Sequence, residues 1–399
     1  QHKTSRNQII LPYQEELKKL GACFGTSGGF ERPMWYALKG EKADYNYSFG
    51  YQNWYPSAEY ETKNTRENVG LFELSPFSKF DLEGQNVHEE LQKICTANIK
   101  DVEGRATYTQ MLNEDGGIET DVTVTCLEKN HFRVIGPAAT REHDKFHIKK
   151  HISEEVNFKD LTEDLTCLGL YGPKSRNLLS NISNDDFTNE GIKFSHGKFV
   201  TIDGVKVWAQ RLSYVGEVGF ELYANIDESK KLFLAIIKEG KNHGLSLCGA
   251  HAMDIMRMES GFLHWGHDIS PEENQYQAGL KFAISYKKNI NFVGKEALLK
   301  IKDQNPTKSL AMMVLKDNRP GEPLLLHEEP IYLDDKIIGR TTSGNYSFNF
   351  NKNISFGYVN SGNTIDNLIN KNLSIEVEKK KYPVTIIEKP LNQKNIKNI

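Results

Sequence analysis

Short runs that alternate apolar and polar residues are interleaved, through the middle of the chain, with stretches of helical periodicity. Residues 122–126 and 132–135 alternate with the two-residue period of a strand. Residues 228–238 and 252–259 instead repeat apolar side chains every three or four positions, as the buried face of a helix does. This mixture predicts an α+β fold for residues 46–303.

The pattern changes at residues 302–306, where the sequence Lys-Asp-Gln-Asn-Pro interrupts it. The remainder is strand-like, with glycines between short runs such as residues 336–338 and 373–377. This spacing predicts a C-terminal all-β module over residues 307–399, either a small barrel or a jelly roll. The tail after Pro390 is rich in Lys and Asn, so we expect it to be frayed.

Residues 1–45 are predicted to form an N-terminal arm and not a domain of their own. Apolar residues at helical spacing between Leu11 and Leu20 predict a short helix. Residues 24–33 follow with three glycines, which is too many for a regular element. We therefore expect a loop there.

The composition narrows the classes of function that are open to the chain. Of its 399 residues, 38% are hydrophobic and 26% are charged, a balance typical of a globular protein. Fifty basic residues against 53 acidic ones give a net charge of −3, which supplies no field to recruit nucleic acid or an anionic membrane surface. No run approaches the roughly 18 consecutive apolar residues of a membrane span. We expect neither a nucleic-acid partner nor a membrane partner.

The cysteines indicate the compartment. Five of them are widely spaced and include no C-x-x-C pair, which argues against a disulfide framework and against a zinc site. A reducing, cytoplasmic location is therefore expected. The sequence lacks an initiator Met, which leaves a processed product and the later part of a longer polypeptide as alternatives.

Residues 104–124 carry the first candidate for chemistry. Residues 113–117 supply the small polar and Gly residues that a tight turn needs, with alternating runs on both sides, so a β-hairpin is predicted. An ordinary structural hairpin is one interpretation. The alternative rests on Asp121, near the start of the apolar second strand, where partial burial would hold an anion beside a cationic intermediate or an amine.

Residues 213–223 carry the second candidate. Two glycines flanked by aromatic residues let the backbone pass close to a flat group. Glu221 lies between two apolar neighbours, so in a strand its side chain points to the opposite face from theirs. It is either a solvated residue at a β-bulge or a bidentate acceptor for the paired N–H groups of a pterin, with Tyr214 near the ring edge.

The helical segment over residues 252–259 is structural by its pattern. Met253, Ile255 and Met256 have near-helical spacing, which favours a place in the core over a cofactor surface. Arg257 and Glu259 are predicted to form structural ion pairs.

No metal site is predicted. His264, His267 and Asp268 are close in sequence, but a turn-like Trp-Gly pair separates the histidines and no third ligand is placed. The chain also lacks a G-x-G-x-x-G after a strand, a P-loop and a nucleophile elbow. Any flavin or nicotinamide is therefore expected on another domain.

Several blocks, taken in order, resemble the glycine cleavage T-protein (aminomethyltransferase) superfamily of folate-dependent enzymes. They are residues 69–80, 108–121, 170–176, 214–221, 253–259, 265–268, 277–280, 292–295 and 340–344. Residues 21–36 and the Ser75-Pro76-Phe77 block are similar to the folate-binding half of dimethylglycine and sarcosine dehydrogenases.

The resemblance implies a cloverleaf of three modules around a central hole that holds tetrahydrofolate, with a jelly-roll-like β-barrel as the last module. It also implies roles for particular residues. Asp121 matches the catalytic aspartate near the folate nitrogens that accept the carbon, Glu221 matches the pterin-binding glutamate, and Tyr214 matches an aromatic folate contact. Tyr108 and Trp265, which begin two of the matched blocks, are predicted as further cofactor contacts.

The chain also departs from the family pattern. The T-protein has a second Asp where this chain has Thr120 and an Arg where it has Met253, which weakens the case for a lipoyl-protein substrate. A tyrosine near the T-protein C-terminus has no clear counterpart after Pro390. The upstream flavin domain of the dehydrogenases is absent from these residues, so FAD is expected only on a separate domain or partner.

The predicted function is a tetrahydrofolate-dependent one-carbon transferase. It would capture the methyl-derived carbon of an N-methyl amine as 5,10-methylenetetrahydrofolate, coupled to a flavoprotein dehydrogenase. Three alternatives stay open: demethylation of an S-methyl or O-methyl compound to give 5-methyltetrahydrofolate, glycine-cleavage aminomethyl transfer, and a non-catalytic folate-binding or regulatory subunit. The donor is correspondingly a small methylated amine or a sulfonium compound.

Overall fold

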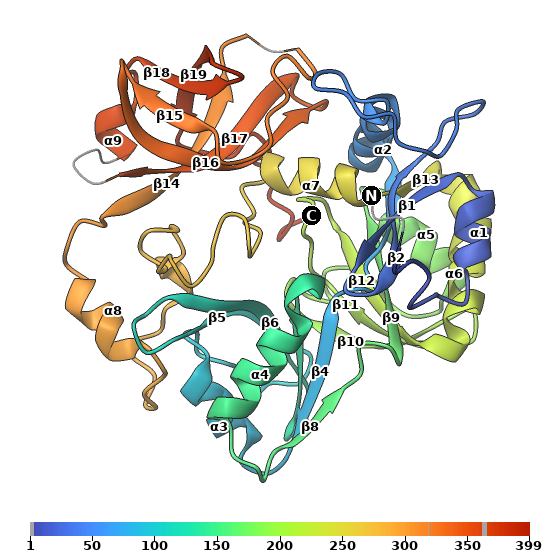
Figure 1. Cartoon of the computed structure of the whole chain (residues 1–399). Helices are drawn as coiled ribbons and strands as arrows, with labels where there is room; N and C mark the ends of the chain where they lie inside the picture. Colours follow the sequence, from blue (N-terminus) through green and yellow to red (C-terminus); the bar gives the residue numbers. More distant parts are fainter. Residues whose placement is uncertain (1–3, 318, 361–364) are drawn as a thin grey trace.

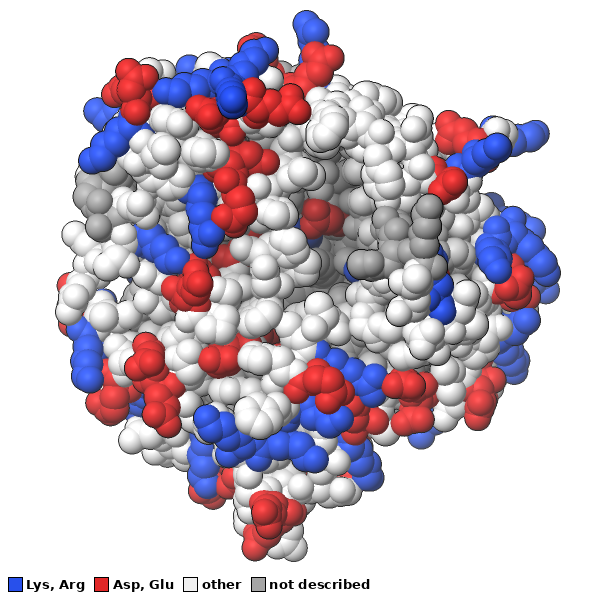
Figure 2. Space-filling view, in the orientation of Figure 1, with Lys and Arg blue, Asp and Glu red and all other residues white. Residues whose placement is uncertain are grey.

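Three lobes are arranged around a common centre in the computed structural model of the chain (Figure 1), and the space-filling view shows a hollow there, the central opening (Figure 2). The structure describes residues 4–317, 319–360 and 365–399, so residues 1–3 of the predicted arm lie outside it. Mixed helices and strands build two of the lobes and a closed six-stranded barrel builds the third. The predicted α+β class with a C-terminal barrel is confirmed.

The N-terminal segment contains a regular hairpin where the sequence predicted a loop. Its elements are α1 (Gln14–Lys19), β1 (Ala22–Ser27) and β2 (Phe30–Tyr36). Gly28 and Gly29 have φ values of 57° and 87°, which are the positive angles that a two-residue turn between antiparallel strands requires. The loop prediction was wrong because these glycines form the turn of a hairpin and do not interrupt its strands.

A six-stranded sheet forms the core of the first lobe. In sheet order its strands are β10 (Gly197–Ile202), β11 (Val205–Gln210), β12 (Gly219–Asn225), β9 (Leu165–Tyr171), β3 (Val69–Glu73) and β13 (Leu245–Cys248). The helices and the 3₁₀ turn of this lobe are α2 (Tyr55–Glu67), α5 (Ser175–Ile182), α6 (Ile226–Gly240), η2 (Lys241–His243) and α7 (Ala250–Glu259). The largest buried apolar cluster lies between one sheet face and α1, α5 and α6, and a second cluster joins the other face to α7. Both faces of the sheet are therefore buried.

A five-stranded antiparallel sheet forms the second lobe. Its order is β5 (Ala106–Leu112), β6 (Ile118–Glu128), β7 (His131–Gly136), β4 (Ser78–Glu83) and β8 (Asn157–Asp160), with η1 (Ala138–Thr140), α3 (Val87–Ile94) and α4 (Arg141–His151). The predicted hairpin is confirmed as β5 and β6. Its turn closes because Asn113 Oδ1 accepts from the Gly117 amide and the Asn113 amide donates to the Gly117 carbonyl.

The barrel is the third lobe. Its strands, in order, are β14 (Lys308–Leu315), β17 (Lys352–Asn360), β16 (Lys336–Ser347), β15 (Pro330–Leu333), β18 (Leu373–Val377) and β19 (Lys380–Ile387), and the short helix α9 (Ile365–Leu368) precedes β18. A long connection with η3 (Lys281–Ala283) and α8 (Lys295–Ile301) leads into it. Within the described residues, no helix combines the length and apolarity that a bilayer crossing requires.

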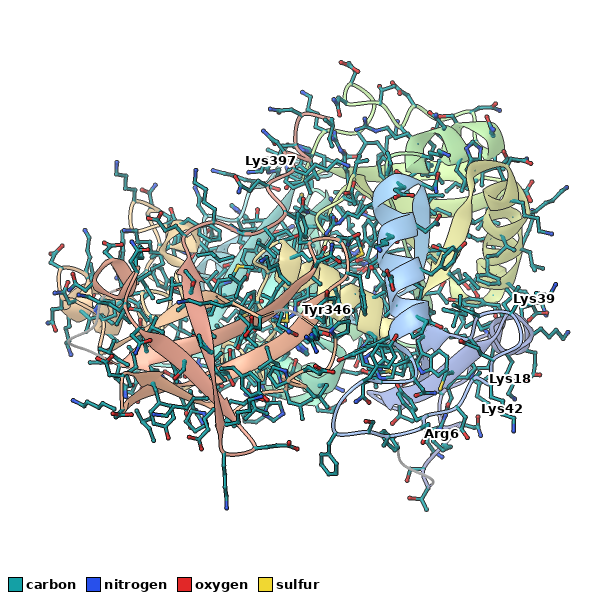
Figure 3. The ribbon with its side chains drawn as sticks, turned by 90° about the horizontal axis from the view of Figure 1, so that it is seen from above. Arg6, Lys18, Lys39, Lys42, Tyr346 and Lys397 are labelled. Carbon is teal, nitrogen blue, oxygen red and sulfur yellow. The ribbon has the colours of Figure 1, made fainter. Side chains whose placement is uncertain are left out.

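An aromatic cluster joins the barrel to the first lobe. Tyr346 and Phe348 from the end of β16 pack with Trp54 and Tyr55 at the start of α2 and with Ile255 of α7. Figure 3 shows Tyr346 in the middle of the molecule, whereas Arg6, Lys18, Lys39 and Lys42 lie at its edge. The barrel is thus fixed against α7, and α7 borders the central opening (Figure 1).

The tail after Pro390 is packed and not frayed. Arg211 is 2% exposed, and its guanidinium donates to the Ile399 carbonyl at 2.7 Å. Asn392 donates its side-chain amide to the Gly216 carbonyl at 2.9 Å, and its backbone amide to Glu259. The prediction failed because backbone carbonyls of the tail satisfy a buried cation, a role that its Lys and Asn composition does not reveal.

Candidate active site

Asp121 lies on the face of β6 that is turned away from the core of the second lobe. Val122 and Val124 occupy the opposite face, inside the buried apolar cluster. Gln110 is its cross-strand neighbour on β5, and Gln110 Nε2 donates to Asp121 Oδ1 at 2.7 Å. Burial raises the pKa of Asp121 to about 6 although this hydrogen bond opposes the shift. The carboxyl group is therefore ionised at neutral pH and more basic than an exposed aspartate.

Tyr108 and Tyr214 accompany Asp121. Tyr108 lies two residues before Gln110 on the same strand face, and its ring stacks near Phe282. Tyr108 is 39% exposed, and the partial loss of contact with water, followed by the charge of Asp121, raises its pKa. Tyr214 donates its hydroxyl to the Leu263 carbonyl at 2.7 Å, and its pKa is raised by burial, with Asp121 among the contributing charges. The structure thus brings these three predicted residues into one cluster.

Glu221 lies in a small pocket between the two sheets. The pocket is lined by Thr123, Thr125, Arg133, Ile135, Trp208, Gln210, Leu212, Glu221 and Tyr223. Tyr223 donates its hydroxyl to Glu221 Oε2 at 2.6 Å, and burial raises the pKa of the carboxyl group. Glu221 is 9% exposed and β12 pairs with β11 and β9 without a shift in register, so the alternative of a solvated residue at a bulge is wrong.

Gln210 faces Glu221 across β11 and β12, and sequence reasoning missed it. Trp208 Nε1 donates to Gln210 Oε1 at 3.1 Å, which fixes the orientation of the amide because an indole N–H can only donate. Gln210 Nε2 is then buried without a hydrogen-bond partner. The pocket accordingly presents a carboxylate acceptor beside an unused amide donor.

Strand β6 connects the pocket to the Asp121 cluster. Thr123 and Thr125 continue the face of β6 on which Asp121 lies, and both line the pocket of Glu221. Trp265 is placed near the beginning of β6, where its Nε1 donates to the Ile118 carbonyl at 3.0 Å. β6 therefore runs from the contact with Trp265, past Asp121, to the pocket that Glu221 lines.

Charged residues of α7 form ion pairs that hold this helix to neighbouring segments. Arg257 donates to Asp254 at 2.8 Å and to Asp268 at 2.6 Å, and Glu259 accepts from Arg66 at 2.6 Å. The predicted ion pairs of Arg257 and Glu259 are confirmed. In the described residues no group of three or more His, Cys, Asp or Glu side chains is arranged to hold a metal ion.

The space-filling view shows a hollow at the centre of the molecule, with acidic and basic atoms on its wall (Figure 2). Comparison with known families accounts for this architecture. The model of the GCVT N-terminal domain matches residues 13–288, and that of the glycine cleavage T-protein C-terminal barrel domain matches residues 308–392. The chain belongs to the glycine cleavage T-protein family. The resemblance inferred from the ordered sequence blocks is confirmed.

Two curated relatives in this family illustrate its range. The 4-methylaminobutanoate oxidase (formaldehyde-forming) of Paenarthrobacter nicotinovorans is 36% identical over 391 residues, 98% of this chain and 47% of that protein. Mitochondrial dimethylglycine dehydrogenase of Rattus norvegicus is 31% identical over 372 residues, 92% of this chain and 42% of that protein. The chain therefore spans less than half the length of either relative.

The fold itself has a solved counterpart. The crystal structure of glycine cleavage system aminomethyltransferase T from Bartonella henselae matches with a TM-score of 0.82 at 23% identity, covering 97% of this chain and 99% of that one. The likeness extends over all three lobes and concerns the fold.

Proposed function

We propose that the chain binds tetrahydrofolate and transfers to it the methyl-derived carbon of an N-methyl amine, giving 5,10-methylenetetrahydrofolate. The names of its relatives support this donor class, because 4-methylaminobutanoate and dimethylglycine are both N-methyl amino acids. Oxidation of the amine is assigned to a flavin that belongs to a separate domain or partner protein.

The pocket of Glu221 carries the proposal. A pterin edge presents two N–H donors next to a carbonyl oxygen. The Glu221 carboxylate is an acceptor for such an N–H pair, and the orphaned Nε2 of Gln210 is a donor for the carbonyl. A buried donor without a partner costs about 1–3 kcal/mol, and a ligand oxygen would remove that cost.

Asp121 is assigned the catalytic role. Tetrahydrofolate supplies the nitrogens that accept the carbon. In this proposal the Asp121 carboxylate, with its pKa of about 6, stabilises a cationic iminium carbon by charge and takes up a proton from nitrogen. Gln110 holds one of its oxygens, and Gln275 in turn donates to Gln110 Oε1 at 2.6 Å. The carboxylate is thus oriented before the ligand arrives.

Calorimetric titration with tetrahydrofolate tests the proposal. The wild-type chain is expected to bind, and Glu221→Ala is expected to lose at least about tenfold in affinity because the N–H pair loses its acceptor. Glu142→Ala is the matched control, since that carboxylate is 76% exposed on α4. Absence of binding by the wild-type chain, or equal binding by Glu221→Ala, would overturn the assignment.

Identification of the product distinguishes the donors. With formaldehyde as the oxidised carbon, formation of 5,10-methylenetetrahydrofolate above the uncatalysed rate is expected. Formation of 5-methyltetrahydrofolate from a sulfonium or O-methyl donor would replace the proposal with the demethylase alternative.

A further inference from the structure

Arg32 is a partly buried cation without an ionic partner in the described residues. It lies on β2, and its Nη2 is 4.0 Å from Sδ of Met253 on α7. No carboxylate oxygen of the described residues comes within 4.0 Å of its guanidinium nitrogens. Burial lowers its pKa. A guanidinium has five N–H donors in a fixed fork, and a thioether sulfur is only a weak acceptor for them.

Other arginines of the interior are paired. Their partners are carboxylates or backbone carbonyls, as in Arg6 with Glu31, Arg66 with Glu217 and Glu259, Arg133 with Asp81, Arg257 with Asp254 and Asp268, and Arg211 with Ile192 and Ile399. Partial burial of an unpaired charge lowers the stability of the folded chain. An unpaired cation in such a place is therefore expected where a bound anionic ligand serves as its counterion.

Two nearby carboxylates influence Arg32 but form no ion pair with it. Asp254 accepts from Arg257 at 2.8 Å and from Asn345 at 2.7 Å. Glu73 accepts from the Ser75 amide at 2.9 Å through Oε1, whereas its buried Oε2 has no hydrogen-bond partner among the described residues. Both charges act on Arg32 from a distance, together with Tyr214. They reduce the local positive potential, so the guanidinium suits a carboxylate with one negative charge better than a phosphate with two.

A close backbone approach brings Arg32 to the centre of the molecule. A Cβ on Gly249 would lie 2.2 Å from the Met34 carbonyl, so the absence of a side chain there lets β2 cross the start of α7. Both elements border the central opening (Figure 1), where the space-filling view shows the hollow (Figure 2). The aromatic ring of Tyr214, a proposed folate contact, is within electrostatic range of Arg32.

We propose that Arg32 binds the carboxylate of a ligand in the central hollow. The inference rests on the proposed function, in which two molecules carry such a group: the N-methyl amino acid donor and the glutamate moiety of tetrahydrofolate. Arg32 is then a specificity-determining residue for carboxylate-bearing ligands.

Matched pairs of ligands test this role and separate the two sources. In the first pair, the affinities of Arg32→Met and of the wild-type chain are measured for tetrahydrofolate and for tetrahydropteroate, which lacks the glutamate. In the second pair, the affinities of both proteins are measured for 4-methylaminobutanoate and for N-methylpropylamine, which lacks the carboxylate. Arg340→Met is the control, because that guanidinium is 53% exposed in a surface ion pair. Each affinity is measured by calorimetry.

The expected result is at least about tenfold weaker binding of the carboxylate-bearing member of one pair, with its partner ligand unaffected. The melting temperature of the unliganded variant is expected to be equal to or above that of wild type. Arg32→Lys, which keeps the charge without the fork, is expected to show a smaller loss of the same selectivity.

Three results would overturn the inference. Arg32→Met could bind all four ligands as wild type does, it could lose both members of a pair equally, or it could melt at a lower temperature, which indicates a structural role. If Arg32→Met does not fold, equal binding of both members by Arg32→Lys and wild type overturns the inference in the same way. Failure of the wild-type chain to bind tetrahydrofolate would instead overturn the proposed function first.

Discussion

At the scale of single residues, the site places charges where they cost stability. Asp121 is held as an anion in partly dry surroundings, and Arg32 lacks a counterion among the described residues. Sequence reasoning predicted roles for Asp121 and Glu221 because each lies in a block that resembles the family. It missed Gln210 and Arg32, because their significance comes from an orphaned donor and an absent partner, which only the folded structure reveals.

Met253 shows how a position can mislead. The T-protein has an Arg at this position, so the Met side chain suggested that this chain lacks the corresponding positive charge. In the structure the Arg32 guanidinium lies against that very side chain, so a cation is present in space although it comes from another element. Met253 therefore weighs less against a lipoyl carrier than the sequence alone suggested.

Asp121→Asn is expected to stabilise the unliganded chain and to slow carbon transfer. Folding raises the pKa of Asp121 from 3.8 to about 6, so the folded state binds more protons than the unfolded state between these values. Stability therefore falls as pH rises from about 4 to about 6, and the full penalty is present at pH 8. The variant should gain about 1–3 kcal/mol at pH 8 and almost nothing at pH 4.

Thermal unfolding at both pH values measures this difference, and transfer assays measure the rate. Tetrahydrofolate binding should persist in Asp121→Asn while transfer falls at least about tenfold. Wild-type transfer should decline as pH falls below about 6, where the carboxylate is protonated. Unchanged transfer by the variant would remove Asp121 from the mechanism.

At the scale of elements, alternation and periodicity predicted several strands of the five-stranded sheet and of the barrel, and the helices near α1, α6 and α7. The predicted helices lie within α6 and α7, and the β5–β6 hairpin and its turn are as expected. The β1–β2 hairpin was not predicted because the glycines of its turn were interpreted as part of a loop. The pairing of the two strands is also irregular, since the register shifts where Phe24 lies opposite Pro33. The local pattern of apolar and polar residues therefore predicts helices and strands. The contacts between these elements depend on residues that are distant in the sequence.

Gly249→Ala is expected to disturb the contact between β2 and α7. Its φ of −92° is accessible to alanine, so the cost comes from the collision of the new Cβ with Met34. We expect a loss of about 2–3 kcal/mol in the free energy of unfolding, together with the ligand selectivity defect of Arg32→Met.

Gly40→Ala is the control for this prediction. Its φ is +92° but no atom lies within 4 Å of the added Cβ, so only backbone strain of about 1 kcal/mol is expected. Denaturant unfolding of both variants measures the two losses. An equal or larger loss in Gly40→Ala would contradict the role of the close approach.

At the scale of the whole molecule, the tail after β19 links the lobes. It leaves the barrel, meets the end of α7 through Asn392, and ends beside Arg211 of the first lobe. Lys394 also pairs with Glu217 at 2.6 Å. These contacts hold both sides of the turn at Gly216, which lies two residues after Tyr214.

Removal of residues 391–399 is expected to destabilise the chain by about 2–4 kcal/mol, because Arg211 is left buried with fewer acceptors. Tetrahydrofolate affinity should fall as well, since the turn after Tyr214 loses its support. Lys397→Ala, in an exposed position, is the control and should leave both quantities unchanged. Thermal unfolding and calorimetry measure them, and a truncated chain equal to wild type would contradict the linking role.

The packed tail has a consequence for synthesis on the ribosome. A nascent chain that has emerged only as far as Pro390 already carries Asp121, Glu221 and Arg32, but the loop of Tyr214 still lacks its ties to residues 392 and 394. The residues of the ligand site are therefore synthesised before the tail residues that stabilise it.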